Sequence, residues 1–226
     1  MRYFTSDLHG EYELFCRLLD KIKFAANDEM IICGDIIDKG AEPIKLAKLI
    51  FSMPNVRCIM GNHEYEFLKF YWSLMKESPE DFDEVLDKLR AYHRNDGHLL
   101  DWDTVDVIEN LPFYIEEEEF LCVHAGIPLN AEKKFVPLNS VSREQFVYDR
   151  IFKEPSVLPR ENKCVLFGHT PAHYVSNRSE IITYPRIDKP QSIKDYYKVH
   201  LDTGTYLVGV MGCFCMETLE CVYVSK

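Results

Sequence analysis

The stretch Gly34-Asp35-Ile36-Ile37-Asp38-Lys39-Gly40 directly follows the apolar run at residues 30–33, which predicts a buried strand that ends on glycine. Two carboxylates lie three residues apart in this loop, and the glycines on both sides allow the backbone to turn sharply. Carboxylates at the end of a buried strand are costly unless positive charge lies beside them. The loop therefore predicts a site for a cation.

The same pattern occurs four more times along the chain. Apolar segments at residues 3–5, 56–60, 120–123 and 164–167 each lead into a short polar motif. The motifs are Ser6-Asp7-Leu8-His9-Gly10, Gly61-Asn62-His63-Glu64, His124-Ala125-Gly126 and Gly168-His169-Thr170. Loops at the carboxyl ends of strands are where α/β folds bind ligands, so we expect these side chains to meet.

The side chains that these loops supply form a mixed nitrogen and oxygen set without a thiolate: Asp7, His9, Asp35, Asn62, His124 and His169. Such a set suits Mn²⁺, Fe or Zn²⁺ better than Ca²⁺. Six ligands are too many for one catalytic ion with an open position, but enough for two ions that share a carboxylate. Two ions roughly 3.5–4 Å apart can hold both the attacking and the leaving oxygen of a phosphoryl displacement.

One such motif alone is more often a turn or an ordinary histidine, and only the five together indicate a metal site. The remaining histidines lack the context of a strand followed by glycine. We interpret them as surface or core residues: His93, His98, His173 and His200.

The order of elements predicts an α/β protein with one domain over residues 1–226. Helical spacing covers residues 11–23, 43–50 and most of 62–110, with a break at 94–97, so the first half alternates strands and helices. The second half should contain a hairpin at 113–122 with Glu116–Glu119 as its solvated turn, a helix at 142–152, and strands at 198–201 and 206–224. The role of the proline-rich loop at 171–198 stays open.

The composition excludes several classes of protein. No apolar run is long enough to span a membrane, and the formal charge of −11 argues against nucleic acid as a partner. Cys33, Cys58, Cys122 and Cys164 lie in expected strands, which indicates reduced core cysteines and a cytoplasmic location. Cys213 and Cys215 share one strand face, but no histidine accompanies them, so we do not interpret them as a metal site.

The five motifs, in this order, resemble the calcineurin-like metallophosphoesterases. More narrowly, they resemble the bacterial and phage branch of the PPP-type serine/threonine protein phosphatases, and Leu201-Asp202-Thr203-Gly204 extends the likeness to residue 204. The resemblance implies a four-layer α/β/β/α sandwich with two central mixed β-sheets and two divalent ions, Mn²⁺ with Fe or Zn²⁺ as alternatives. Asp7, His9 and Asp35 would hold one ion. Asp35, Asn62, His124 and His169 would hold the other.

The resemblance also implies roles around the metal centre. His63 would protonate the leaving group. Asp38 would orient His63, since a carboxylate raises the pKa of an imidazole and fixes its tautomer. Arg150, with Asn62 and Lys39, would bind the phosphate, and Arg143 is the fallback for Arg150. Glu64 either supports a ligand or is merely the first-turn acid of the next helix, and we favour the second interpretation.

Two departures from the family pattern concern the substrate. Lys39 and Met60 stand where relatives carry arginine, so the substrate differs from a typical phosphoprotein or the loop after Thr170 supplies Arg178 or Arg186.

Three functions follow as hypotheses. The first is a monomeric, metal-dependent phosphomonoesterase, foremost a protein serine/threonine phosphatase, with phosphotyrosine or a small phosphoester as further substrates. The alternative is a symmetrical dinucleoside polyphosphate hydrolase, although such enzymes commonly lack the carboxylate of Asp38 and have aspartate in place of Glu64. The third is a scaffold without turnover, which the complete set of ligands disfavours.

Overall fold

The computed structural model describes residues 1–77, 81–92, 99–185 and 187–226. Its strands are β1 (Arg2–Thr5), β2 (Glu29–Ile32), β3 (Val56–Cys58), β4 (Tyr114–Glu116), β5 (Phe120–Val123), β6 (Cys164–Phe167), β7 (Ile182–Tyr184), β8 (Lys198–His200), β9 (Val210–Cys215) and β10 (Cys221–Ser225). Its α-helices are α1 (Tyr12–Ile22), α2 (Pro43–Ser52), α3 (Asn62–Glu77), α4 (Phe82–Tyr92), α5 (Trp102–Glu109), α6 (Arg143–Tyr148), α7 (His173–Ser176) and α8 (Thr205–Val208). Short 3₁₀ turns cover Leu138–Ser140 and Ile193–Asp195.

Two mixed sheets form the centre of the molecule. The first has the order β10-β9-β1-β2-β3, in which β1, β2 and β3 are parallel and β9 pairs antiparallel with β1. The second has the order β4-β5-β6-β8-β7, with β5, β6 and β8 parallel and an antiparallel strand at each edge. The alternation of strands and helices in the first half therefore produces the expected parallel core.

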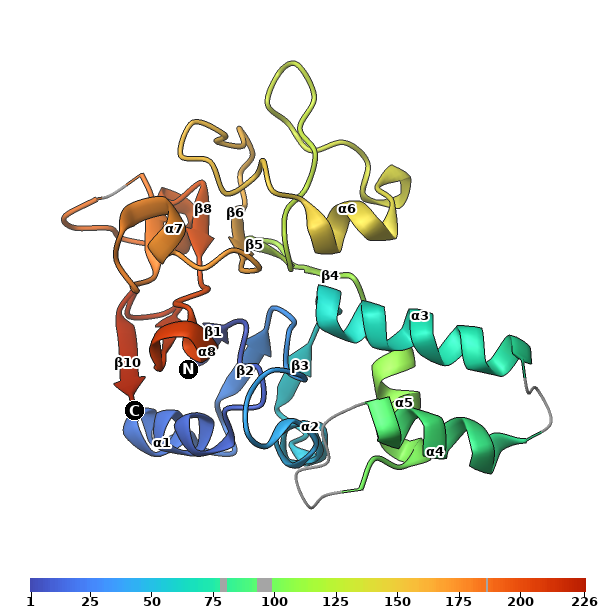
Figure 1. Cartoon of the computed structure of the whole chain (residues 1–226). Coiled ribbons are helices and arrows are strands. Elements are labelled where there is room, and N and C mark those ends of the chain that lie inside the picture. The colour runs from blue at the N-terminus through green and yellow to red at the C-terminus, as the bar shows by residue number, and fades with distance from the viewer. Residues whose placement is uncertain (78–80, 93–98, 186) are drawn as a thin grey trace.

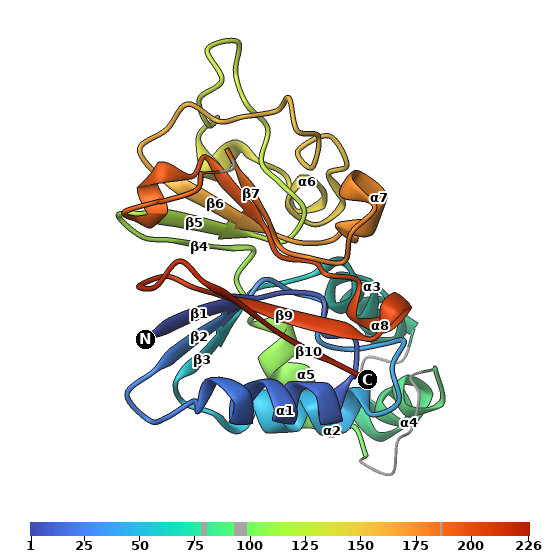
Figure 2. The ribbon, with the colours of Figure 1, turned by 90° about the vertical axis from the view of Figure 1, so that its left-hand side faces the viewer.

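The two faces of each strand enter different cores because side chains alternate along a strand. In β1, Phe4 faces the second sheet and its ring lies 5.0 Å from that of Phe120, centroid to centroid. Tyr3, on the other face, belongs to the core that contains Leu14 and Phe15 of α1. Figure 2 shows α1 and α2 against the outer face of the first sheet and α6 beyond the second. These layers are the predicted four-layer sandwich.

Helices α3, α4 and α5 lie together to one side of the sheets (Figure 1). The predicted break at 94–97, together with His93 and His98, lies outside the described residues. None of the helices that the structure describes is long and apolar enough to cross a bilayer.

The predicted helix at 142–152 is wrong at its end, because α6 stops at Tyr148. Asp149 leaves the helix with φ −56° and ψ 132°, and its side-chain oxygen accepts the backbone N–H groups of Ile151 and Phe152. This local hydrogen bonding replaces the last helical turn, as aspartate side chains often do. The resulting turn carries Arg150.

The predicted strand at 206–224 is also wrong at its start. Thr205–Val208 forms the helix α8 between Gly204 and Gly209, both of which have left-handed backbone angles. Glycine adopts these angles readily, so it can begin and end a helical turn within a sequence of high β propensity. Two strands, β9 and β10, follow, with a turn near Glu217 and Thr218 between them.

The acidic run is more than the solvated turn that we expected. It lies at the turn between β4 and β5, where Glu117 binds Arg2 at 2.9 Å and Arg57 at 2.7 Å. These two ion pairs join the second sheet to β1 and β3 of the first. All eight cysteines are free, and Cys213 and Cys215 are buried in β9 without a metal-binding cluster among the described residues.

Candidate metal centre and active site

The predicted ligands come together at one edge of the two sheets. Asp7 and His9 follow β1, Asp35 follows β2, and Asn62 opens α3 directly after β3. His124 and His169 follow β5 and β6 of the second sheet. The loops of the first sheet are joined by backbone hydrogen bonds from the N–H groups of Asp7, His9 and Gly10 to the carbonyls of Gly34, Asp35 and Ile36.

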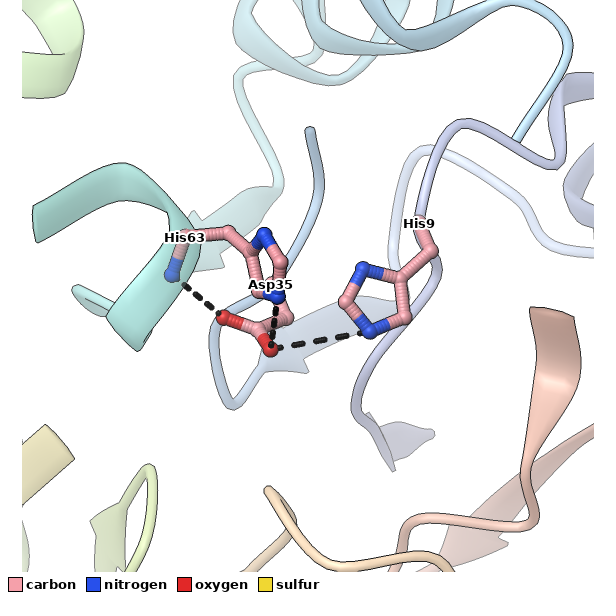
Figure 3. A group of neighbouring side chains, drawn as sticks. All are labelled: His9, Asp35 and His63. Atoms are coloured by element: carbon pink, nitrogen blue, oxygen red, sulfur yellow. Dashed lines mark hydrogen bonds and ion pairs between the residues drawn. The ribbon is translucent and has the colours of Figure 1, made fainter. Parts of the chain in front are cut away.

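Asp35 lies at the middle of the cluster. Its Oδ2 is 3.6 Å from Nε2 of His9 and 3.9 Å from Nε2 of His63, and its Oδ1 is 3.5 Å from Nε2 of His124. Figure 3 shows both the His9 and the His63 ring turned toward this carboxylate. Imidazole nitrogens thus lie on both sides of the Asp35 carboxylate. This is the geometry that a carboxylate shared between two ions needs.

A second group gathers around Asn62. Its side-chain oxygen lies 3.0 Å from Nε2 of His124 and 2.8 Å from Nδ1 of His169. Nδ1 of His124 lies 2.7 Å from the carbonyl oxygen of Cys33, so this nitrogen carries the proton and Nε2 presents a lone pair. The lone pairs of Asn62 Oδ1 and His124 Nε2 thus face each other across 3.0 Å. A cation bound to both atoms would stabilise this arrangement.

Glu64 has a structural role that sequence reasoning assigned wrongly. It is fully buried, and its carboxylate accepts four backbone hydrogen bonds. Oε2 accepts from the N–H groups of Asp35 at 2.8 Å and Gly61 at 3.0 Å, and Oε1 accepts from those of Ile36 at 2.8 Å and Ile37 at 3.0 Å. Glu64 therefore fixes the loop that carries Asp35, rather than only stabilising the first turn of α3.

The loops that carry the ligands hold unusual backbone angles. Asp7, His9, Asp35 and His169 all have positive φ, between 46° and 71°, and so do Asp38 and Lys39. Side chains other than glycine rarely adopt these angles, which cost roughly 1–3 kcal/mol each and cluster at functional sites. The fold thus holds the candidate ligands in backbone conformations that they would not adopt alone.

The electrostatics of the cluster favour bound cations. Burial and the nearby Asp7 charge raise the pKa of Asp35 well above its usual range. Burial lowers the pKa values of His9 and His169 to about 3, which leaves both imidazoles neutral, as metal ligation requires. Nε2 of His169 is buried without a hydrogen-bond partner.

Lys39 already places a cation in the cluster, since its Nζ lies 2.9 Å from Nε2 of His9. The six residues therefore fit divalent ions. They offer nitrogen and oxygen donor atoms, Nε2 of His169 has no hydrogen-bond partner among the described residues, and the ammonium group of Lys39 shows that the cluster accommodates positive charge.

His63 and Asp38 lie beside the ligands and form a pair. Nδ1 of His63 is 2.9 Å from Oδ2 of Asp38. Burial opposes protonation of His63, but the hydrogen bond to Asp38 and the charge of Asp35 outweigh it and raise its pKa. The structure thus places an imidazole with a raised pKa next to the cluster, where a leaving group could receive its proton.

A cavity of about 240 Å³ opens over the cluster, with His9, His169, Lys39 and Arg150 in its wall. Arg150 is exposed, and no side-chain hydrogen bond or ion pair engages it in the part of the chain that the structure describes. Its guanidinium is therefore available to a phosphate.

Arg143 and Arg178, which the sequence offered as further cations, do not line this cavity. Arg143 packs on the ring of Phe113, Arg178 pairs with Glu180 at 3.9 Å, and Arg186 lies outside the described residues. Met60 is buried in the core.

The comparisons with known proteins agree with this geometry. A family model described as calcineurin-like phosphoesterase matches residues 3–201. The chain belongs to this family. Proteins of this family are phosphoesterases that use a dinuclear centre of divalent metal ions.

Two curated relatives carry the same name. A protein of Buchnera aphidicola subsp. Schizaphis graminum is 29% identical over 128 residues, which cover 55% of this chain and 44% of the relative. One of Haemophilus ducreyi is 31% identical over 133 residues, again 55% and 44%. Both are named symmetrical bis(5′-nucleosyl)-tetraphosphatase, and in each case the match spans less than half the length of the relative.

Solved structures share the fold at low identity. A protein provisionally named a diadenosine tetraphosphatase superposes with a TM-score of 0.72 at 16% identity, covering 100% of this chain and 93% of its own. A yeast protein serine/threonine phosphatase gives 0.52 at 12% identity, with 100% and 79% covered. At these identities the likeness establishes the metallophosphoesterase fold alone.

Two features of this phosphoesterase site escaped sequence analysis, and a third, Asp202, was noted there only as part of a family motif, without a role. Asp202 follows β8 and lines the cavity, so the strand-end pattern that identified the ligands also applies to it. Tyr174 and Tyr206 line the same cavity from α7 and α8, and no sequence motif marks either. As expected, His200 is a core residue stacked on Phe167 and His173 is exposed.

Proposed function

We propose that this phosphoesterase hydrolyses symmetrical dinucleoside polyphosphates, with diadenosine tetraphosphate as the first substrate to test. The cavity carries this proposal, because Lys39 and Arg150 lie beside the metal ligands in its wall. A chain of four phosphates needs several cations along its length, and two divalent ions with these two side chains would supply them. The names of the curated relatives favour the same substrate.

The residues of the chain divide the work as follows. Two divalent ions, when bound by Asp7, His9, Asp35, Asn62, His124 and His169, supply an activated water and neutralise phosphate charge. Arg150 and Lys39 bind phosphoryl oxygens and align the polyphosphate. Glu64 holds the Asp35 loop in position, and His63 keeps a proton at Nε2 while Asp38 holds Nδ1.

The pair of His63 and Asp38 favours a second candidate, a protein serine/threonine phosphatase. An alkoxide leaving group is strongly basic and needs a proton, whereas a nucleoside diphosphate leaves without one. Sequence analysis placed this activity first because Asp38 and Glu64 match the phosphatase pattern. The names of the relatives reverse that order, and the geometry of His63 keeps the phosphatase as a candidate.

One experiment separates the two candidates. The Mn²⁺-loaded protein is incubated with diadenosine tetraphosphate, a phosphoserine peptide and a phosphotyrosine peptide, with Asp35→Asn as the inactive control. We expect two molecules of ADP from each dinucleotide, formed by the addition of one water, and no product with Asp35→Asn. Release of phosphate from the peptides with an intact dinucleotide would establish the phosphatase instead.

The proposal includes the expectations about the cellular setting. We propose a monomer in the cytoplasm that acts on a diffusible substrate and binds neither extended nucleic acid nor membranes. Size-exclusion chromatography with light scattering tests the oligomeric state, and a mass of twice the 26.5 kDa of the chain would contradict it.

A further inference from the structure

Large apolar side chains are exposed around the cavity over the metal centre. Tyr174 of α7 is 69% exposed, and Tyr206 and Leu207 of α8 are 45% and 55% exposed. All three line that cavity, together with Pro171 and Gly204. Exposed apolar groups gathered at one concave site mark a ligand-binding surface.

Among the described residues, no hydrogen bond of the hydroxyl groups explains the position of the two tyrosine rings, and the Tyr174 ring only meets the His173 ring edge to face, 5.9 Å apart. In the part of the chain described, no hydrogen bond engages the hydroxyl of Tyr174 or Tyr206. Other tyrosines are held by such bonds: the hydroxyl of Tyr65 donates to Glu144, and that of Tyr223 accepts the backbone N–H of Ile181. The rings at the cavity are therefore not held in place by their hydroxyl groups, and both are exposed.

One residue, Asp202, contacts the starts of both helices that carry these rings. The main-chain carbonyl of Asp202 accepts the N–H of Ala172, which precedes α7, at 2.8 Å. Its side chain accepts the N–H of Gly204, which precedes α8, at 2.8 Å. Asp202 thus connects the start of both helices to the end of β8, next to the metal ligands.

The cavity combines two chemistries, with cations at Lys39 and Arg150 and aromatic faces at Tyr174 and Tyr206. A ligand that matches both has phosphates at one end and a flat, largely apolar ring at the other. We infer that Tyr174 and Tyr206 form a platform on which a nucleobase of the substrate stacks. The inference rests on the proposed function and adds the residues that recognise the nucleoside.

Stacking on an aromatic ring tolerates any base, because every base has a π face. The platform should therefore bind adenine and guanine nucleotides with similar affinity. Its role is to increase the affinity for the substrate, so its loss should raise KM and leave kcat nearly unchanged.

The test compares two non-hydrolysable ligands that differ only in the nucleoside. Equilibrium binding of adenosine 5′-(α,β-methylene)diphosphate and of methylenediphosphonate is measured in the presence of Mn²⁺. The parent should bind the nucleotide at least about ten-fold more tightly. Tyr174→Ala and Tyr206→Ala should each reduce that preference several-fold, and the two phenylalanine variants should retain it.

Tyr197→Ala is the matched control, since Tyr197 is 42% exposed and lies outside the cavity wall. Equal affinity of the parent for both ligands would overturn the platform, and so would an unchanged preference in both alanine variants. An effect of these variants on phosphopeptide cleavage alone would assign the rings to a peptide and also overturn it. Because binding is measured without turnover, failure of dinucleotide hydrolysis is seen separately and concerns the proposed function.

Discussion

Burial and neighbouring charge give the histidines of this site different protonation states. Burial lowers the pKa of His9 and of His169 to about 3, so both are neutral at physiological pH, as metal ligands must be. The hydrogen bond to Asp38 and the charge of Asp35 instead raise the pKa of His63. Titratable groups whose surroundings push their pKa values apart take different chemical roles. At the scale of residues, the site therefore separates candidate metal ligands from a candidate proton donor.

Replacing His63 tests that separation. We expect His63→Asn to keep full Mn²⁺ content while lowering kcat on an alkyl phosphate by about 10²–10⁴-fold, since a basic leaving group needs the proton. The rate on 4-nitrophenyl phosphate should fall much less. Steady-state kinetics with both substrates and metal analysis provide the measurement. Equal losses on the two substrates would rule out proton donation by His63.

At the scale of elements, Glu64 joins the first turn of α3 to the loop after β2. In Glu64→Gln, one oxygen can keep two of the four backbone hydrogen bonds, while the amide N–H₂ faces two other N–H donors. We expect a loss of about 2–4 kcal/mol in the free energy of unfolding and weaker Mn²⁺ binding. Urea unfolding and metal titration measure the two effects.

Glu66→Gln is the control, because Glu66 lies on the same helix with its side chain 52% exposed. It should change the free energy of unfolding by less than about 0.5 kcal/mol. Comparable losses in the two variants would mean that Glu64 contributes no more than a surface charge.

Lys198 joins another pair of elements. Its ammonium group is buried at the start of β8 and donates to the carbonyls of Phe152 and Glu154, in the turn that follows Arg150. Burial lowers its pKa to about 7, below the ordinary 10.5. Between these two values the unfolded chain binds more protons than the folded one, so the folded state gains stability as the pH rises.

We therefore expect the unfolding free energy of the parent, minus that of Lys198→Met, to increase from pH 7 to pH 9. The increase should be about 1 kcal/mol per pH unit. Urea unfolding across this range, with the half-exposed Lys194→Met as control, provides the measurement. A difference that stays constant with pH would show that Lys198 has an ordinary pKa in the folded protein.

The elements themselves were largely predictable from sequence, and so were the residues at the ends of the strands. Apolar runs that end on Gly, Asp or His identify the strands because a buried strand needs a turn before the chain can return. Helix α8 and the turn after Tyr148 were not predicted, since Gly204, Gly209 and the side chain of Asp149 act locally against the propensity of their neighbours. Glu64 was misjudged because its acceptor role depends on the backbone of a loop 27–29 residues away.

At the scale of the whole molecule, the candidate metal centre lies between the two sheets. Asp7, His9, Asp35 and Asn62 belong to loops of the first sheet, and His124 and His169 to loops of the second. The way the sheets stack could not be derived from strand patterns, and for the same reason the cavity with Tyr174 and Tyr206 was not foreseen. Ions bound to both sets of ligands would link the two sheets.

Metal binding should therefore stabilise the entire fold. At a Mn²⁺ concentration 100-fold above the dissociation constant, we expect a gain of about 2.7 kcal/mol, which corresponds to a rise in Tm of about 5–10 °C. Thermal unfolding with Mn²⁺ and after EDTA measures it, and Asp35→Asn should show no rise. The same rise in that variant would place the stabilising ions elsewhere.

The pairing of β1 with β9 has a consequence for how the protein is made. Tyr3 and Phe4 pair with Cys215 and Phe214, so two strands at opposite ends of the sequence are neighbours in one sheet. During translation β1 is an open sheet edge until more than 200 further residues have left the ribosome, and such an edge can pair with other chains. Contacts of this long range also slow folding. The nascent chain is therefore exposed to aggregation at β1 until β9 has been synthesised, and chaperones that shield β1 would increase the yield.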